Sequence, residues 1–308
     1  MIHLGLSLTP FGHDPEAWQG AKREALGFDA LLKQALLADE AGFDFVWLGD
    51  SMGERPVDAL SPVATPFEPT TLASALATKT KNIGLIATAA THQHEPYNLA
   101  RRFASLDWIS HGRAGWAIAA GTNDVRDREY VELVGALWDS WEEDAFIYDK
   151  AAGRFFVPEK MHVLNHKGAN FSVRGPLNVN RSPQGKPVLA AISNSPVAHL
   201  ADVIFVLDGA PIAQVARERA EVRVIKSVTG FTGGAADVAD IFEREAESGI
   251  DGFVLMPSTT AELGSFIETI LPELIRRGLL RTALKRATLR DRLGLSRPVH
   301  PASLERAS

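Results

Sequence analysis

The sequence predicts a (β/α)8 barrel, and three observations support this fold class. Apolar segments of strand length recur eight times along the 308 residues, at near-regular spacing. Each is followed by a segment that has the apolar spacing or the length of a helix. No Gly-x-Gly-x-x-Gly turn follows the first segment, which disfavours the main alternative, an open doubly wound sheet. Barrels of this class usually take about 250 residues, so the chain has room for modest additions.

The predicted strands are, in chain order, residues 2–8, 43–48, 83–87, 115–118, 187–192, 203–207, 221–228 and 252–256. The first unit shows how the pattern works. Leu31, Leu32, Ala35 and Leu36 lie on one face of the first helix, and Gly42 ends that helix directly before the second strand. A helix that ends at a small residue and passes at once into an apolar strand is typical of parallel sheets.

Later units repeat this succession. The chain passes through Asn82 before the third strand and through Gly112 before the fourth. Residues 247–254 repeat the pattern of residues 40–46, which indicates one architecture from end to end. The last strong amphipathic helix covers residues 267–275.

One domain over residues 1–280 is therefore expected, with two additions. Residues 153–173 carry alternating apolar residues and a break at Pro158, which predicts a strand-rich excursion that covers one end of the barrel. Residues 281–308 are basic, contain proline and are weakly patterned, which predicts a draped or mobile tail.

Composition excludes several classes of protein. The net charge of -6 offers no basic field for nucleic acid, and no run of 18 apolar residues occurs. The chain has no cysteine, so it contains no disulfide, no thiolate metal site and no cysteine nucleophile. The start of the chain lacks a basic leader before an apolar stretch. We expect a cytoplasmic protein that binds neither nucleic acid nor a membrane.

Residues that follow the strands are the candidates for chemistry, because barrel enzymes place their sites at the carboxyl ends of the strands. Hydroxyls and amides dominate among them, which favours a polar organic ligand or a phosphate over a metal ion. For any single Ser or Thr, the alternative is a helix N-cap. The candidates are Ser7, Thr9, Asp50, Ser51, Thr88, Thr91, His92, His94, Gly121, Thr122, Asn123, Ser193, Asn194, Ser195, Asp208, Thr229, Met256 and Ser258.

Metal and hydrolase sites are not expected. His92 and His94 could share a zinc ion, but no histidine follows strands five to eight to complete the site. His162 and His166 are interpreted as solvated histidines of the excursion. No Gly-x-Ser-x-Gly turn is present for a Ser-His-Asp hydrolase. The glycines at 230, 233 and 234 fit either a phosphate loop or a plain flexible loop.

Several segments carry a more specific signal. The segments are 43–51, 95–107, 112–116, 137–142, 171–178 and 181–185, with 251–253, 271–274 and 288–291 near the end. Together they resemble the bacterial-luciferase-like flavin-dependent monooxygenases, in the branch of the nitrilotriacetate and dibenzothiophene-sulfone monooxygenases. The resemblance covers nearly the whole chain.

This resemblance implies a homodimeric barrel that takes reduced FMN from a separate NAD(P)H-dependent flavin reductase and uses oxygen to oxygenate a small organic substrate. Carried over by position, Asp50, Ser51, Ala90 and Thr91 would border the isoalloxazine ring. The turn Ser193-Asn194-Ser195 would hold the phosphate end. His92 is the tentative catalytic residue, and its role as acid, base or pocket wall stays open.

The chain also departs from these relatives. Ala117 stands where they have Asn, and Asp124 stands where a Tyr would face the phosphate. The loop after strand four is shortened, and the long insertion that follows strand seven in relatives is missing. Two alternatives therefore stay open: a redox-silent flavin-binding barrel, and a flavin-free barrel lyase or hydrolase.

Overall fold

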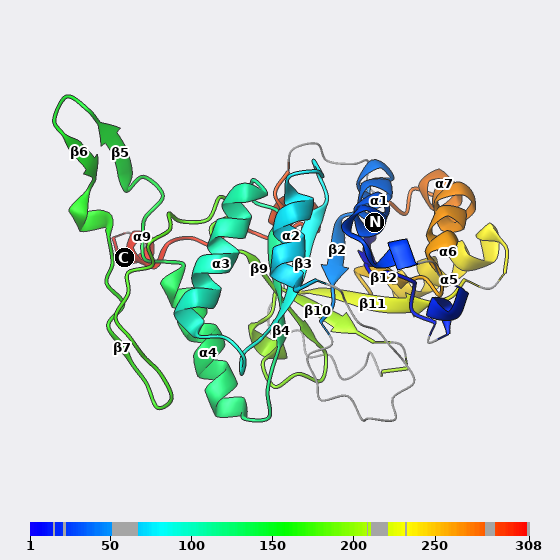
Figure 1. The fold of residues 1–308 in the computed structure, drawn as a ribbon, viewed down its shortest axis with the longest axis horizontal. Helices are drawn as coiled ribbons and strands as arrows, with labels where there is room; N and C mark the ends of the chain where they lie inside the picture. Colours follow the sequence, from blue (N-terminus) through cyan, green and yellow to red (C-terminus); the bar gives the residue numbers. More distant parts are fainter. Residues whose placement is uncertain are drawn as a thin grey trace.

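The computed structural model describes residues 1–14, 16–20, 23–50, 67–207, 209–210, 221–231, 233–280 and 287–306. Eight parallel strands close into a barrel in the order β1-β12-β11-β10-β9-β4-β3-β2 (Figure 1). They are β1 (His3–Ser7), β2 (Phe45–Leu48), β3 (Gly84–Ala90), β4 (Ala114–Ala119), β9 (Val188–Ile192), β10 (Val203–Val206), β11 (Arg223–Thr229) and β12 (Gly252–Met256). Leu4 pairs with Phe253 and Leu6 with Leu255, so the first and last strands close the ring. The predicted barrel is confirmed.

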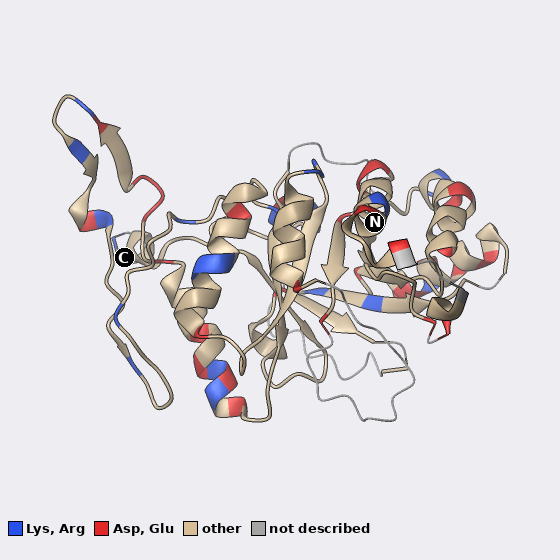
Figure 2. Cartoon of the chain, viewed as in Figure 1, with Lys and Arg blue, Asp and Glu red and all other residues tan. Residues whose placement is uncertain are grey.

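Helices cover the outside of the barrel. They are α1 (Phe28–Glu40), α2 (Pro69–Ala77), α3 (Pro96–Ile109), α4 (Asp124–Leu137), α5 (Ala235–Glu247), α6 (Thr260–Ser265), the π-helix η6 (Phe266–Ile270) and α7 (Leu271–Arg276). The crossover from β9 to β10 is an exception, because it holds only the 3-10 turn η4 (Ala198–Leu200). Figure 2 shows basic and acidic residues interspersed along α4. None of the helices in the described ranges is long and apolar enough to cross a membrane.

Inward-facing side chains fill the barrel. Phe45, Ile86, Val188, Phe205 and Val254 belong to one buried apolar cluster. A Cβ on Gly5 would lie 2.3 Å from the ring of Phe45, so only glycine leaves room for that ring at this position on β1.

The C-terminal segment closes the amino-terminal end of the barrel. It forms α8 (Leu289–Leu293) and α9 (Pro301–Glu305). Leu289 and Leu293 are fully buried in the interior cluster, and the Leu289 side chain lies against Gly84 at the start of β3. Arg223, at the start of β11, donates to the carbonyl oxygens of Leu293 (2.7 Å) and Gly294 (2.6 Å). The sequence predicts a draped or mobile tail at residues 281–308, and in its described part α8 lies against the barrel, held by two buried leucines.

The excursion consists of two hairpins, β5 (Phe146–Asp149) with β6 (Arg154–Phe156) and β7 (His166–Lys167) with β8 (Ser172–Val173). Both extend beyond α3 and α4 on the side of α9 (Figure 1). Phe171 contacts Tyr130 of α4 edge to face, with ring centroids 5.6 Å apart. The excursion thus packs on the outer side of α4, whereas the sequence pattern predicted a cover over one barrel end.

A buried carboxyl group joins α3 to the segment before β9. Asp107 accepts hydrogen bonds from the backbone N–H of Ala114 (2.9 Å), from Gln184 Nε2 (2.6 Å) and from the Ser182 hydroxyl. Burial raises the pKa of Asp107 to about 6, although these donors act in the opposite direction.

Candidate active site

Two aromatic rings stack on each other inside the barrel, near the carboxyl ends of the strands. The rings of Trp47 (β2) and Phe205 (β10) stack with centroids 4.6 Å apart and 12° between their planes. Trp47 Nε1 donates to Thr88 Oγ1 of β3 at 3.1 Å, which fixes the indole. Because β2 and β10 stand opposite each other in the closed ring, the stacked pair spans the interior. The residues that follow the strands lie beyond this pair, at the carboxyl end of the barrel.

The residues that the resemblance places around the isoalloxazine ring follow two adjacent strands. Asp50 follows β2 and is partly exposed, and Ala90 ends β3 and is fully buried. Thr91 follows Ala90, and its N–H donates to the carbonyl oxygen of Ala119 at the end of β4 (3.1 Å). Ser51 lies outside the described residues. Asp50, Ala90 and Thr91 thus stand at neighbouring positions on the rim.

Asp127 determines how the ends of β3 and β4 are held, and no sequence pattern pointed to it. The Thr91 hydroxyl donates to Asp127 Oδ1, and the Gly121 N–H donates to Asp127 Oδ2, both at 2.6 Å. Asp127 is buried in the first turn of α4, and its neighbour Arg126 donates to the carbonyl oxygen of Thr91 (3.2 Å). The Thr91 hydroxyl therefore donates its hydrogen within the protein, so a ligand here would contact the methyl group or the backbone of Thr91.

The three side chains of the turn after β9 differ in their hydrogen bonds. The Ser193 N–H donates to the carbonyl oxygen of Phe205 (2.9 Å), which continues the ladder with β10. Ser195 Oγ accepts a long hydrogen bond (3.5 Å) from the N–H of Val197 within the turn, whereas the N-cap of η4 is Val197 and has no side-chain cap. Within the described ranges, the side chains of Ser193 and Asn194 make no hydrogen bond, which leaves them available to a ligand.

The two positions that depart from the relatives differ in their surroundings. Ala117 points into the barrel and belongs to the same apolar cluster as Phe205. Asp124 is exposed in the first turn of α4, where its charge stabilises the amino-terminal end of the helix. The N-cap of this helix is Asn123, whose Oδ1 accepts from the N–H of Arg126 (3.1 Å).

The sequence-predicted histidines lie at the rim. His92 is exposed directly after Thr91. His94 is half-buried, and its pKa lies below the usual value because of burial first and then the positive charge of Arg102.

His13 was missed by the sequence analysis, yet it has the most defined geometry of the histidines at the mouth. Its Nδ1 lies 3.2 Å from the carbonyl oxygen of Pro257, and its Nε2 lies 2.9 Å from Ser7 Oγ. A carbonyl oxygen only accepts, so Nδ1 carries the hydrogen in the neutral ring and Nε2 accepts from the Ser7 hydroxyl. Burial lowers the pKa of His13, which favours this neutral ring.

The loop that carries His13 is fixed on the loop after β12. The backbone N–H of His13 donates to the carbonyl oxygen of Pro257 (2.8 Å), and that of Asp14 to Ser258 (3.1 Å). Gly12 has φ +107°, and a Cβ there would lie 2.2 Å from the Ser258 oxygen. A glycine followed by a histidine shortly after the first strand is the signal that could have identified this residue.

The two histidines of the excursion are paired rather than solvated. His162 Nε2 lies 3.0 Å from Glu142 Oε1, and His166 Nε2 lies 3.0 Å from Glu129 Oε1. The interpretation of both as free loop histidines is therefore wrong, because the excursion folds back on α4 and its following loop.

Comparison with known proteins identifies the family. Residues 6–240 match the luciferase-like monooxygenases. N-acetyl-S-(2-succino)cysteine monooxygenase of Bacillus subtilis (strain 168) is 43% identical over 232 residues, which are 66% of this chain and 52% of that protein. The chain thus spans about half the length of this relative.

Two other relatives match along most of their length. One of the subunits of pristinamycin IIA synthase from Streptomyces pristinaespiralis is 36% identical over 263 residues, 85% of this chain and 87% of that protein. Nitrilotriacetate monooxygenase component A of Aminobacter aminovorans is 30% identical over 401 aligned positions, 85% of this chain and 88% of that protein. The aligned length exceeds the 308 residues of this chain, so that relative carries insertions that are absent here.

A solved structure agrees over the whole chain. Riboflavin lyase (RcaE), solved with modified FMN and the substrate riboflavin, superposes with a TM-score of 0.84 at 26% identity and covers 100% of both chains. The expected branch and the closed barrel are both confirmed, and the chain belongs to the luciferase-like monooxygenase family.

Proposed function

We propose that the chain is the oxygenase component of a two-component monooxygenase, which receives reduced FMN from a separate NAD(P)H-dependent flavin reductase and oxygenates a small organic substrate. The observation that carries the proposal is the Trp47–Phe205 ring stack inside the barrel, below a rim with free polar side chains. A planar heteroaromatic ring packs well beside the partly exposed Trp47 indole, and a phosphate needs hydrogen-bond donors at some distance from it. Family membership supports the same function.

The residues of this chain fit FMN as follows. The isoalloxazine ring would lie beside the Trp47 indole, bordered by Asp50, Ser51, Ala90 and Thr91. The phosphate would meet the free side chains of Ser193 and Asn194, with Ser195 shaping the turn. When bound, reduced FMN supplies the two electrons that activate oxygen for insertion of one atom into the substrate.

Two histidines would take part in proton transfer and in contact with the substrate. His13 holds a neutral ring in one tautomer, and its Nε2 can take a proton from Ser7 Oγ or return one to it. The Ser7 side chain faces the barrel interior, because Gly5, two residues before it on β1, faces the Phe45 ring. His92 is exposed at the rim, where it would meet the substrate as acid, base or pocket wall.

A second candidate function is that of a chain that oxygenates only together with another member of the same family. The departures at Ala117 and Asp124 favour it, because they remove two polar contacts from the cofactor site. The chain also aligns with 87% of a protein that is one subunit of a synthase, and this match favours the second candidate as well. In the first candidate the dimer is a homodimer, and in the second it is a heterodimer.

The decisive experiment measures FMN binding and turnover separately. We expect the purified chain to quench FMN fluorescence at one site per chain. With NADH, FMN, a flavin reductase and oxygen, we expect it to convert an oxidisable substrate to an oxygenated product that the reductase alone does not form. Candidate substrates are sulfones, amino-carboxylates and heteroaromatics. Binding without turnover, converted to turnover by a co-expressed family member, would select the second candidate. Absence of FMN binding under both conditions would refute both.

A further inference from the structure

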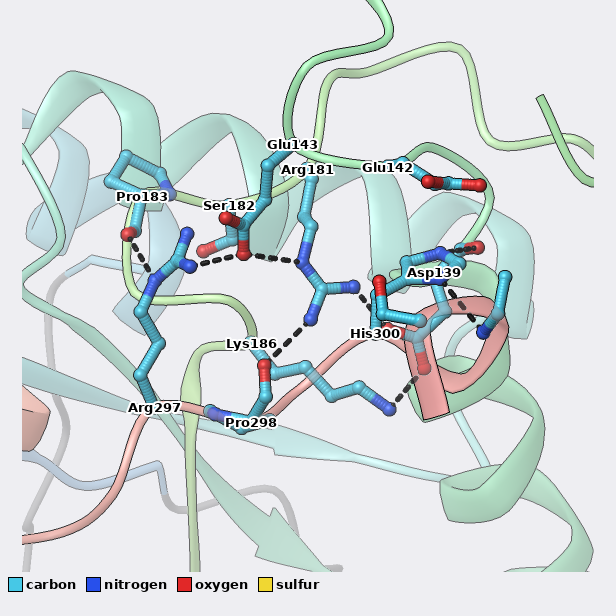
Figure 3. A network of polar contacts seen from close by, with 12 residues as sticks. Asp139, Glu142, Glu143, Arg181, Ser182, Pro183, Lys186, Arg297, Pro298 and His300 are labelled. Atoms are coloured by element: carbon cyan, nitrogen blue, oxygen red, sulfur yellow. Dashed lines mark hydrogen bonds and ion pairs between the residues drawn. The ribbon is translucent and has the colours of Figure 1, made fainter. Parts of the chain in front are cut away.

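Three side chains able to bind a metal converge far from the barrel mouth. Glu142 follows α4, His162 lies in the excursion and His300 directly precedes α9. One ligand atom from each lies within 4.8 Å of the other two. Glu142 and His300 are buried and His162 is half-buried. Figure 3 shows Glu142 and His300 in the polar network between the C-terminal segment and the end of α4.

We infer that Glu142, His162 and His300 form a binding site for a divalent transition metal ion, with Zn²⁺ as the best-fitting ion. Two imidazoles and one carboxylate are a common zinc donor set that leaves one position for water. The inference uses neither the flavin nor the barrel mouth, so it does not depend on the proposed function.

The spacing of the ligand atoms suits a tetrahedral ion. With bonds of about 2.0–2.1 Å, ligand atoms around zinc stand about 3.3 Å apart. His162 Nε2 and Glu142 Oε1 are 3.0 Å apart. The two imidazole rings have centroids 5.0 Å apart and an interplanar angle of 37°. Since the ligand atoms lie within 4.8 Å of one another, an approach of up to about 1.5 Å by one ring would complete the geometry.

His300 already has the second hydrogen bond that metal-bound histidines make. Its Nε2 donates to the carbonyl oxygen of Asp139 (2.9 Å), which leaves the lone pair on Nδ1. Nδ1 now accepts from the N–H of Ala302 at a long 3.2 Å. The Asp139 carboxylate is held by Arg181 and Lys186, each at 2.5 Å, which fixes the residue whose carbonyl oxygen orients His300 (Figure 3).

Arg306 forms an ion pair with the Glu142 carboxylate, which is the group that the metal ion would bind. Its two terminal nitrogens lie 3.0 Å from Glu142 Oε1 and 2.6 Å from Glu142 Oε2. The Arg306 side chain is 59% exposed, so it can return to water with little loss of stability. A cavity of about 460 Å³, lined by Glu142, His300 and Arg306, adjoins the cluster and gives the ion a path. The guanidinium and the metal ion therefore compete for Glu142.

The test is Zn²⁺ binding by the full chain after treatment with EDTA, measured by competition with a chromophoric chelator and by the shift in Tm. We expect one ion per chain and a higher Tm. His162→Gln should weaken binding by more than the roughly 10- to 100-fold lost with an outer-shell partner. Arg306→Ala should strengthen binding about tenfold, because the competing cation is gone.

The matched control is His166→Gln, which removes a similar half-buried histidine paired with a glutamate, Glu129. This variant should bind Zn²⁺ as tightly as the wild type. Circular dichroism establishes that each variant is folded. Equal losses in His162→Gln and His166→Gln, or no binding by either the wild type or Arg306→Ala, would overturn the inference.

Discussion

Trp47 and Phe205 stack face to face although their strands stand on opposite sides of the closed sheet. In Trp47→Leu the aromatic ring that a flavin would pack against is lost, and such stacking is worth ~0.5–1.5 kcal/mol. We therefore expect FMN affinity to fall by up to about tenfold. Trp47→Phe keeps a ring and loses only the hydrogen bond to Thr88, so its affinity should stay near that of the wild type. Equal affinities in all three proteins, measured by fluorescence titration, would place the flavin elsewhere.

Thr91→Val removes the hydroxyl that donates to Asp127 and preserves the shape of the side chain. Asp127 would lose a buried partner, so the free energy of unfolding should fall by about 1–3 kcal/mol. The FMN affinity should not change, because this hydroxyl is turned to the protein. Urea unfolding and flavin titration on the same sample test both statements. A large loss of flavin affinity with unchanged stability would show that the hydroxyl contacts the ligand.

Ser193→Ala and Ser195→Ala should differ. Ser193 has a free hydroxyl, so its loss should weaken FMN more than riboflavin, which has no phosphate. The Ser195 hydroxyl accepts a bond within the turn, so its loss should lower the Tm slightly and weaken both flavins alike. The two flavins are compared by titration of each variant. Identical behaviour of the two variants would contradict the assignment of separate roles.

His13 should titrate below the ordinary histidine value of 6.5, because burial disfavours its charged form. The unfolded chain then binds the proton more readily than the folded chain. The contribution of His13 to stability is therefore present above pH 6.5 and is lost as the pH falls below that value. NMR titration of the ring protons gives the pKa directly, with His13→Gln as the assignment control. A pKa at or above the ordinary histidine value would refute the neutral tautomer bonded to Ser7.

Asp107→Asn removes a buried carboxyl group whose pKa is raised to about 6. In the wild type the protonated form favours folding, so stability is present below the unfolded value near 4 and is lost as the pH rises through about 6. Relative to Asp107→Asn, the wild type should lose up to roughly 3 kcal/mol between about pH 4 and 7. Denaturant unfolding at several pH values measures this difference. A pH-independent difference between the two proteins would contradict the raised pKa.

The sequence was sufficient to predict the barrel, because each strand is a continuous apolar run and each helix has an apolar stripe. It was also sufficient to place Asp50, Ala90, Thr91 and the β9 turn on one rim, since parallel strands all end on the same side. These conclusions need only periodicity and strand order.

Contacts between distant segments could not be predicted in this way. Asp127 is one of several acidic residues on α4, and only the fold shows that it turns to Thr91 and Gly121. His13 depends on the meeting of the first and last βα loops, which the closure of the ring brings about. Leu289 and Leu293 lie in a basic segment, whose composition gave no sign of burial.

The closure of the barrel by α8 bears on how the chain is made. Leu289 fills space beside Gly84 and Gly115, which the ribosome synthesises long before it. Synthesis proceeds at about 5–20 residues per second, so all eight strands emerge before the side chains that complete their interior. The amino-terminal end of the nascent barrel must therefore stay unfilled until residues 289–293 have left the exit tunnel, and its tight packing is reached only then.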